Sequence, residues 1–149
     1  MTCIVDKQCC MPHTTVHFVF DLEAVQSERT HHIWDLAFQH VCTGKTFQRY
    51  VDPQLSVYPP PPDPTLFHVT STFLQQQKAQ PFSVVVQELL QWVHSFTGTH
   101  FVFMSHGCFV LDKPLLEFEF GRQQLIPPSN WYFFDTLPFF RSKYRKQPS

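Results

Sequence analysis

The segment VDPQLSVYPPPPDPT, at positions 51–65, restricts the fold of this chain more than any other stretch. It holds six of the chain's 13 prolines. Because proline fixes one backbone angle and lacks an N–H, this stretch can form neither the interior of a helix nor a central strand. We expect a stiff connector within one domain, with a polyproline ligand for an SH3 or WW partner as the alternative. Regular structure has to lie on either side.

Before the proline-rich segment, the sequence has the pattern of strands. HFVFDLEAV, at 17–25, reads as a buried strand. The aromatic-rich runs HHIWDLAFQHV and KTFQRYV follow it and flank CTGK, a hairpin turn in which Gly44 supplies the permissive backbone. These patterns predict three consecutive strands.

After the proline-rich segment, helices and strands alternate. PFSVVVQELLQWVHSF, from Pro81, has apolar residues at helical spacing, and THFVFMS is a short apolar strand. A second helix is predicted to start near Asp112, and NWYFFD supplies a fifth strand that ends at Asp135. Because strand–helix–strand connections normally join parallel neighbours, the sheet is expected to be mixed. The prediction is an α/β fold with one mixed five-stranded sheet and flanking helices.

Composition narrows the class of protein. With 149 residues, 43% of them hydrophobic, the chain suits a single domain. Its 11 basic and 12 acidic residues exclude a protein that coats nucleic acid through a broad basic surface. We find neither a signal peptide nor an apolar run of the roughly 18 residues that a membrane span needs. The five cysteines, odd in number and irregularly spaced, suit a reducing compartment, so we expect an intracellular protein, cytoplasmic or nuclear, without a membrane partner.

Asp21 and Glu23 are the first candidate functional residues. Residues two apart on a strand point to the same side, so both carboxylates face one way. Such a pair suits a divalent cation, although a strand that ends in a polar loop would look the same. Asp112 precedes Lys113 and Pro114 at a helix start, where an N-cap role is the alternative.

The two ends of the chain carry weaker signals. We place a flexible N-terminus at 1–16, the folded domain at 17–140 and a basic tail at 141–149. The tail either contacts phosphates or is a solvated end. A zinc site is the less favoured alternative for the N-terminal cysteines and histidines, because their spacing is poor for zinc. These residues are Cys3, Cys9, Cys10, His13 and His17.

Four segments, in order along nearly the whole chain, resemble the DEDD 3'-5' exonucleases of the RNase H-like fold, which include proofreading and TREX-type enzymes. VFDLEAV is similar to the family's first motif, Asp-x-Glu on a strand. FHVTSTFLQQQKAQPFSVVVQELLQWV resembles its IHGIT segment and the helix that follows. SHGCFVLDKPLLEFE is similar to the second motif, in which a His-Gly pair precedes an Asp that opens a helix, and WYFFDTLPFFR to the DTL strand end.

The resemblance implies an enzyme that removes nucleotides from the 3' end of DNA or RNA with two Mg²⁺ or Mn²⁺ ions. It implies that Asp21, Glu23 and Asp112 are both the metal ligands and the catalytic residues, with Asp21 shared by the two ions. The implied substrate-binding residues are Leu22, Ala24, Val25, His68 and His106.

The sequence departs from the family pattern at its end. The family's last helix carries a His that acts as general base and an Asp about five residues later, whereas the 14 residues after Asp135 contain no His, Asp or Glu. The FHVT segment is also one residue shorter than the family's and lacks its glycine. We therefore expect a C-terminally truncated member of the family. The alternative function is a non-catalytic module that binds nucleic acid or protein on an exonuclease scaffold.

Overall fold

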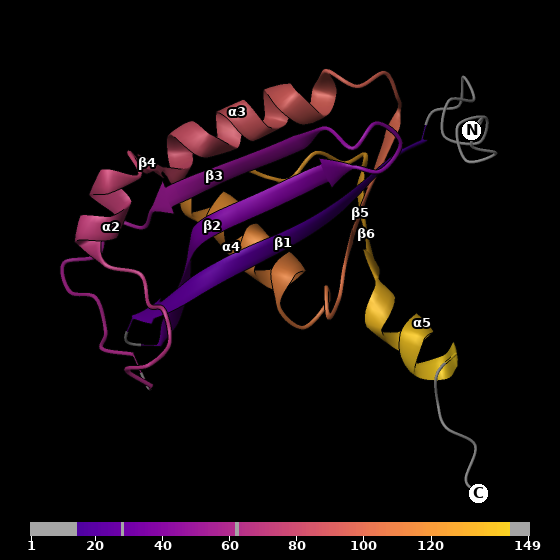
Figure 1. Ribbon diagram of the computed structural model, residues 1–149. Coiled ribbons are helices and arrows are strands. Elements are labelled where there is room, and N and C mark those ends of the chain that lie inside the picture. Colours follow the sequence, from indigo (N-terminus) through magenta and orange to yellow (C-terminus); the bar gives the residue numbers. More distant parts are fainter. Residues whose placement is uncertain (1–14, 28, 62, 144–149) are drawn as a thin grey trace, which may run out of the picture.

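The computed structural model describes residues 15–27, 29–61 and 63–143 (Figure 1). In chain order its strands and helices are β1 (Thr15–Ser27), β2 (Thr30–His40), β3 (Thr46–Asp52), α2 (Ser71–Gln76), β4 (Gln80–Pro81), α3 (Phe82–His94), β5 (His100–Ser105), α4 (Asp112–Arg122), β6 (Trp131–Asp135) and α5 (Thr136–Lys143). β1 thus begins two residues before the expected domain boundary, and α5 extends three residues into the expected tail. Cys3, Cys9, Cys10 and His13 lie outside the described residues, as do the last six residues of the tail.

One mixed sheet organises the chain, with the strand order β4-β3-β2-β1-β5-β6. β1, β2 and β3 are antiparallel neighbours, and β5 and β6 continue the sheet in parallel with β1. The mixed α/β architecture is as predicted, but the sheet has six strands instead of five. The additional strand, β4, has two residues that pair with Val51 and Asp52 of β3, too short a segment to leave a pattern in the sequence.

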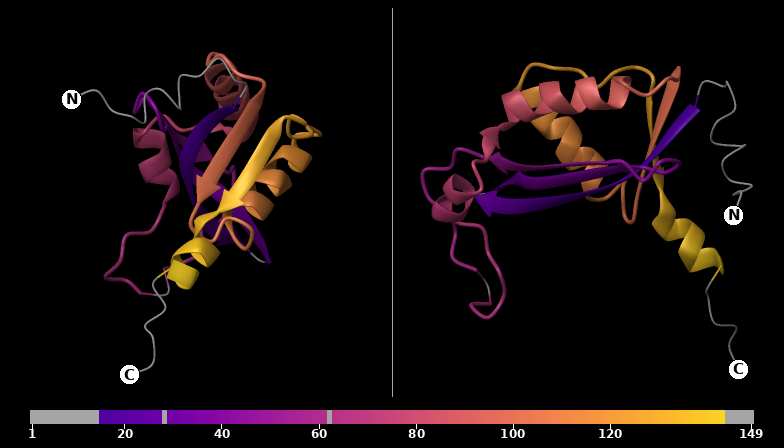
Figure 2. Two further views of the ribbon diagram at one scale, coloured as in Figure 1. Left: turned by 90° about the vertical axis from the view of Figure 1, so that its right-hand side faces the viewer. Right: turned by 45° about the horizontal axis from the view of Figure 1, so that its top comes forward.

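Helices α3 and α4 lie on one face of the sheet and bury its apolar residues (Figures 1 and 2). Alternate residues of β1, among them Phe18, Phe20 and Leu22, are buried in the same core as the inner side of α3. Asp21 and Glu23, at the positions between, are exposed. The two-residue period of β1 therefore separates the core from the acidic side chains.

Val51 and Asp52 complete β3, and the rest of the proline-rich segment, where the structure describes it, is a loop between β3 and α2, as predicted. It is followed by Phe67, whose ring packs against Trp34 of β2 at 5.7 Å between centroids and against Phe73 of α2 at 5.1 Å. Tyr50 of β3 joins this cluster by contacting Phe73 at 5.3 Å. The aromatic cluster therefore anchors the loop and α2 to the β2–β3 end of the sheet.

Two further features bear on the sequence predictions. The β2–β3 turn contains Gly44 at a φ of +70°, a conformation that glycine adopts without strain, as expected. Helix α5, which begins directly after β6, was not predicted, and none of its residues is buried. No helix within the described ranges is long and apolar enough to cross a membrane.

Candidate active site

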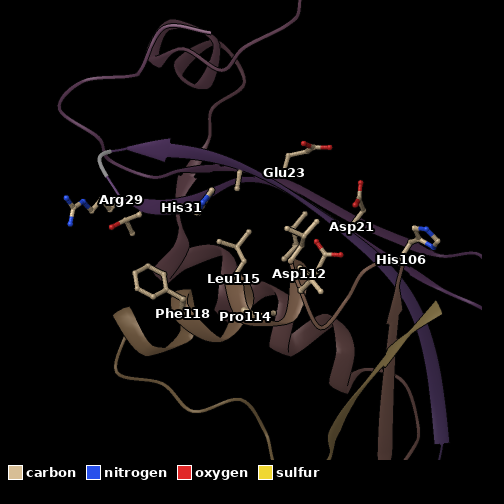
Figure 3. A pocket seen from close by; sticks show the side chains of 14 residues that line it. Asp21, Glu23, Arg29, His31, His106, Asp112, Pro114, Leu115 and Phe118 are labelled. Carbon is tan, nitrogen blue, oxygen red and sulfur yellow. The ribbon is translucent and has the colours of Figure 1, made fainter. Parts of the chain in front are cut away.

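Strand β1 is longer than its parallel neighbour, and this difference opens a space beside it. β5 pairs with β1 only over Thr15–Val19, whereas β2 accompanies β1 as far as Ser27. Asp21 and Glu23 therefore lie where one edge of β1 has no strand partner. Helix α4 lies across from this edge, so the unpaired part of β1 and the start of α4 face each other (Figure 3).

A cavity of about 680 Å³ occupies this space, within the size range of small-molecule sites. Three carboxylates line it, namely Asp21 and Glu23 from β1 and Asp112 from α4. The other lining residues are Leu22, Ala24, Arg29, Thr30, His31, His106, Val110, Leu111, Pro114, Leu115 and Phe118. Two segments separated by about 90 positions in the sequence thus bring their acidic residues to one cavity, as the two motifs suggested.

The carboxylates influence one another electrostatically. Partial burial raises the pKa of Glu23, and the negative charges of Asp21, Asp35 and Asp112 raise it further. The pKa of Asp112 is also raised, mainly by burial and in addition by the charges of Asp21 and Asp135. A cation placed among these groups would relieve this repulsion.

Asp112 is the first residue of α4, but it does not cap the helix. The N-cap position belongs to Leu111, and no side chain there makes a capping hydrogen bond. The N-cap alternative for Asp112 is therefore wrong. Its carboxyl instead lies against the cavity, at a helix N-terminus whose dipole favours negative charge.

Asp135 has a different role at the end of β6. Its carboxylate accepts hydrogen bonds from the backbone N–H groups of Gly107 (2.9 Å), Phe109 (3.2 Å) and Leu137 (2.9 Å). Burial alone would raise its pKa, but these donors outweigh burial and hold the pKa of Asp135 below its ordinary value. Asp135 thus fixes the loop that leads into α4, where Gly107 has a φ of +77°.

The other residues implied by the resemblance fall into two groups. Leu22, Ala24 and His106 line the cavity with the carboxylates. Val25 and His68 instead line a second cavity of about 250 Å³, which shares Glu23 and Ala24 with the first. The second cavity is also lined by Gln26, Trp34, Pro59, Pro60, Pro61, Phe67 and Val69. The proline-rich loop therefore forms a wall beside Glu23.

The donor chemistry of the first cavity suits a hard divalent cation, because carboxylate oxygens are the ligands that Mg²⁺ and Mn²⁺ prefer. The side chains as placed do not form a coordination shell. No three His, Cys, Asp or Glu side chains in the part of the chain that the structure describes are arranged to hold a metal ion. The chemistry thus fits a cation, while the geometry does not show a preformed site.

The sequence matches no protein-family model and no curated protein. A solved structure, the nuclease domain of 3'hExo, a DEDDh family member, bound to rAMP, does match: the TM-score is 0.57 at 17% sequence identity, over 91% of this chain and 72% of the other. This chain has an RNase H-like exonuclease fold. At this identity the match establishes the fold alone.

On this exonuclease fold, sequence reasoning missed one side of the cavity. Leu115 and Phe118 follow Asp112 at three-residue spacing on α4, so the helical period could have identified them. Arg29 comes from the β1–β2 turn and His31 from the start of β2, and no motif marks them. They reach the cavity because β2 folds back along β1, where a register shift between Glu23 and Ala24 changes the pairing.

Proposed function

We propose that this chain is a divalent-cation-dependent 3'-5' exonuclease that binds the 3' end of a DNA or RNA strand in the carboxylate-lined cavity. One observation carries the proposal: Asp21, Glu23 and Asp112 converge on one cavity of an exonuclease fold. The similar 3'hExo domain was solved with rAMP, which supports a nucleotide as the ligand class.

The three carboxylates are the groups that would hold two Mg²⁺ or Mn²⁺ ions. When bound, such ions lower the pKa of water and stabilise the charge that develops on the phosphate. The chain's own residues would orient the strand: Leu22 and Ala24 border the cavity along the part of β1 that β5 does not pair with. Val25 and His68 would contact the strand from the second cavity.

His106 is the imidazole at the carboxylate end of the cavity (Figure 3). Its Nδ1 lies 3.4 Å from the Thr136 hydroxyl, so the imidazole has a neighbour that can fix its orientation. We assign to His106 the removal of the proton from the attacking water. General bases commonly contribute on the order of 10² to 10⁴ in rate, so His106→Gln should slow hydrolysis by about this factor while preserving strand binding.

The test is degradation of a 5'-labelled single-stranded oligonucleotide with Mg²⁺, Mn²⁺ or chelator. We expect a ladder of products that shorten from the 3' end, only with metal, and lost in Asp21→Ala. Glu88→Gln is the matched control, because Glu88 is an exposed carboxylate on α3 that pairs with Arg49 at 2.8 Å and does not line the cavity. Shortening that persists in Asp21→Ala would contradict the proposal.

A second candidate function is metal-dependent binding of a 3' end without hydrolysis. It is the alternative that the sequence left open, in which the same three carboxylates hold the cation and the strand end but no residue removes a proton from water. Retention of the oligonucleotide with Mn²⁺, lost in Asp21→Ala but without shorter products, would support this binding module over the exonuclease.

A further inference from the structure

The cavity has two chemically different ends. The three carboxylates lie at one end, Arg29 and Phe118 lie at the other, and Leu115 lies between them (Figure 3). Arg29 is the only Lys or Arg among the described lining residues. Its side chain has no hydrogen bond or ion pair with another residue that the structure describes. A permanently positive group is therefore available at the end of the cavity away from the proposed phosphate site.

Phe118 offers a flat apolar surface at this same end. The residue remains 46% exposed although α4 packs on the sheet, so the ring is accessible from the cavity. The Arg122 guanidinium lies 5.9 Å from the ring centroid. Arg122 is itself held by the buried Glu119 carboxylate at 3.2 Å and by His32 at 2.7 Å. The ring is thus supported from the protein side and available for stacking.

The order of these groups defines the ligand that would fit. A phosphate near the carboxylates needs a cation there, which leaves the end with Phe118 and Arg29 for another part of the nucleotide. A ligand that meets an apolar wall and then a guanidinium must have flat apolar faces and an edge of hydrogen-bond acceptors. A nucleobase has this shape, and aromatic side chains stack on its faces.

Guanine is the base that matches Arg29 best. It presents O6 and N7 side by side, two acceptors that an arginine fork binds in bidentate fashion, whereas adenine places an amino donor beside N7. Building on the proposed function, we propose that Arg29 and Phe118 form a nucleobase subsite that selects guanine as the 3'-terminal base. The Phe118 ring would stack on the base, and the Arg29 guanidinium would distinguish guanine from the other bases.

The experiment measures binding of 5'-fluorescein-labelled oligonucleotides that differ only in the 3'-terminal base: guanine, adenine, cytosine, thymine or 7-deazaguanine. Fluorescence anisotropy is recorded with Ca²⁺ in place of Mg²⁺ to slow hydrolysis. Wild type should bind the guanine-ended strand on the order of ten- to a hundredfold more tightly than the adenine-ended strand. The 7-deazaguanine strand, which lacks N7, should lose most of this preference.

Variants separate base recognition from simple charge. Arg29→Ala should abolish the preference for guanine while leaving the affinity for the adenine-ended strand near that of wild type. Arg29→Lys, which retains the charge without the planar fork, should reduce the preference without removing it. Phe118→Ala should weaken binding of every strand about tenfold, through lost stacking. Lys45→Ala and Phe109→Ala are the controls, because neither residue lines the cavity.

The outcomes distinguish this inference from the function it builds on. Equal binding of all five strands by wild type, or a guanine preference that survives in Arg29→Ala, would overturn the guanine subsite and leave the exonuclease proposal intact. Binding that Arg29→Ala weakens equally for all five strands would show that Arg29 contacts phosphate instead. Binding of none of the strands would overturn both proposals.

Discussion

Asp112 and Asp135 are two aspartates in similar positions with opposite electrostatics. Each begins or immediately precedes a helix, and their side chains are almost equally buried, since the residues are 7% and 8% exposed. The pKa of Asp112 is raised by burial, whereas backbone donors outweigh burial at Asp135 and lower its pKa. Burial alone therefore does not decide the direction in which the pKa of a carboxyl group moves. The number of fixed N–H donors does so.

The largest expected effect is loss of the structural carboxylate. Asp135→Ala removes the acceptor of three backbone N–H groups, including that of Gly107, and should lower the melting temperature more than loss of any cavity carboxylate does. Thermal unfolding followed by circular dichroism measures it. Asp63→Ala is the control, because Asp63 bonds only its near neighbour Thr65 and should change little. Equal melting of Asp135→Ala and wild type would refute the structural assignment.

The pH dependence of this effect follows from the direction of the shift. Because the pKa of Asp135 is lowered on folding, the stability it contributes is fully present above the ordinary value of 3.8. It is lost as the pH falls through the lower folded pKa. The difference in stability between wild type and Asp135→Ala should therefore shrink in strong acid.

Metal should stabilise the protein by the next largest amount, and only through the functional carboxylates. A ligand that binds the folded state alone adds about 2.7 kcal/mol when its concentration is a hundred times its Kd. We expect millimolar Mn²⁺ to raise the melting temperature of wild type relative to chelator, and not that of Asp21→Ala. Glu88→Gln, which removes an exposed carboxylate outside the cavity, should retain the shift. Identical melting of wild type with Mn²⁺ and with chelator would count against the site.

When metal is absent, we expect a smaller effect, in which loss of a cavity carboxylate raises the stability of the protein. Because the pKa of Asp112 is raised on folding, its ionised form opposes folding near neutral pH, so Asp112→Asn should be more stable than wild type in chelator. This gain should vanish as the pH falls toward the ordinary value of 3.8, where wild type is protonated as well. Urea unfolding at pH 7.5 and pH 5 measures it. A gain that is larger at pH 5 would contradict the direction of the shift.

The smallest effect should come from the outer side of α4. Lys113 and Glu117 form an ion pair at 2.8 Å on the helix surface. Exposed pairs of this spacing contribute about 0.3–0.5 kcal/mol, so Glu117→Gln should lower stability by no more than this and leave the Mn²⁺ shift unchanged. A changed Mn²⁺ shift in the same urea and thermal measurements would mean that charge anywhere on α4 influences the cavity.

The fold was largely predictable because apolar residues recur at regular spacing in its main strands and helices. The alternation in β1 and the helical spacing in α3 are read directly from the sequence, and the crossover rule then gives the parallel β5 and β6. β4 could not be predicted because two residues carry no period. α5 lacks an apolar face that packs on the core, so nothing in its sequence marks it as part of the folded domain.

The candidate site was only partly predictable. Asp21 and Glu23 follow from the strand period, and Asp112 from the helix start. Arg29 and His31 depend on how β2 returns along β1. That return includes the register shift at Glu23, which places Trp34 opposite no residue of β1 and makes it available to the second cavity. Register is a property of paired strands, so a single strand's pattern does not contain it.

The two margins of the sheet differ in how they could meet another molecule. At one margin β4 is two residues long and includes Pro81, which has no N–H to offer a further strand. At the other, β6 is five residues long and contains no proline. Copies of this protein that associate by continuing the sheet would therefore join through β6. A lysine at the exposed Phe134, as Phe134→Lys, would be the change to make against fibril-like self-assembly.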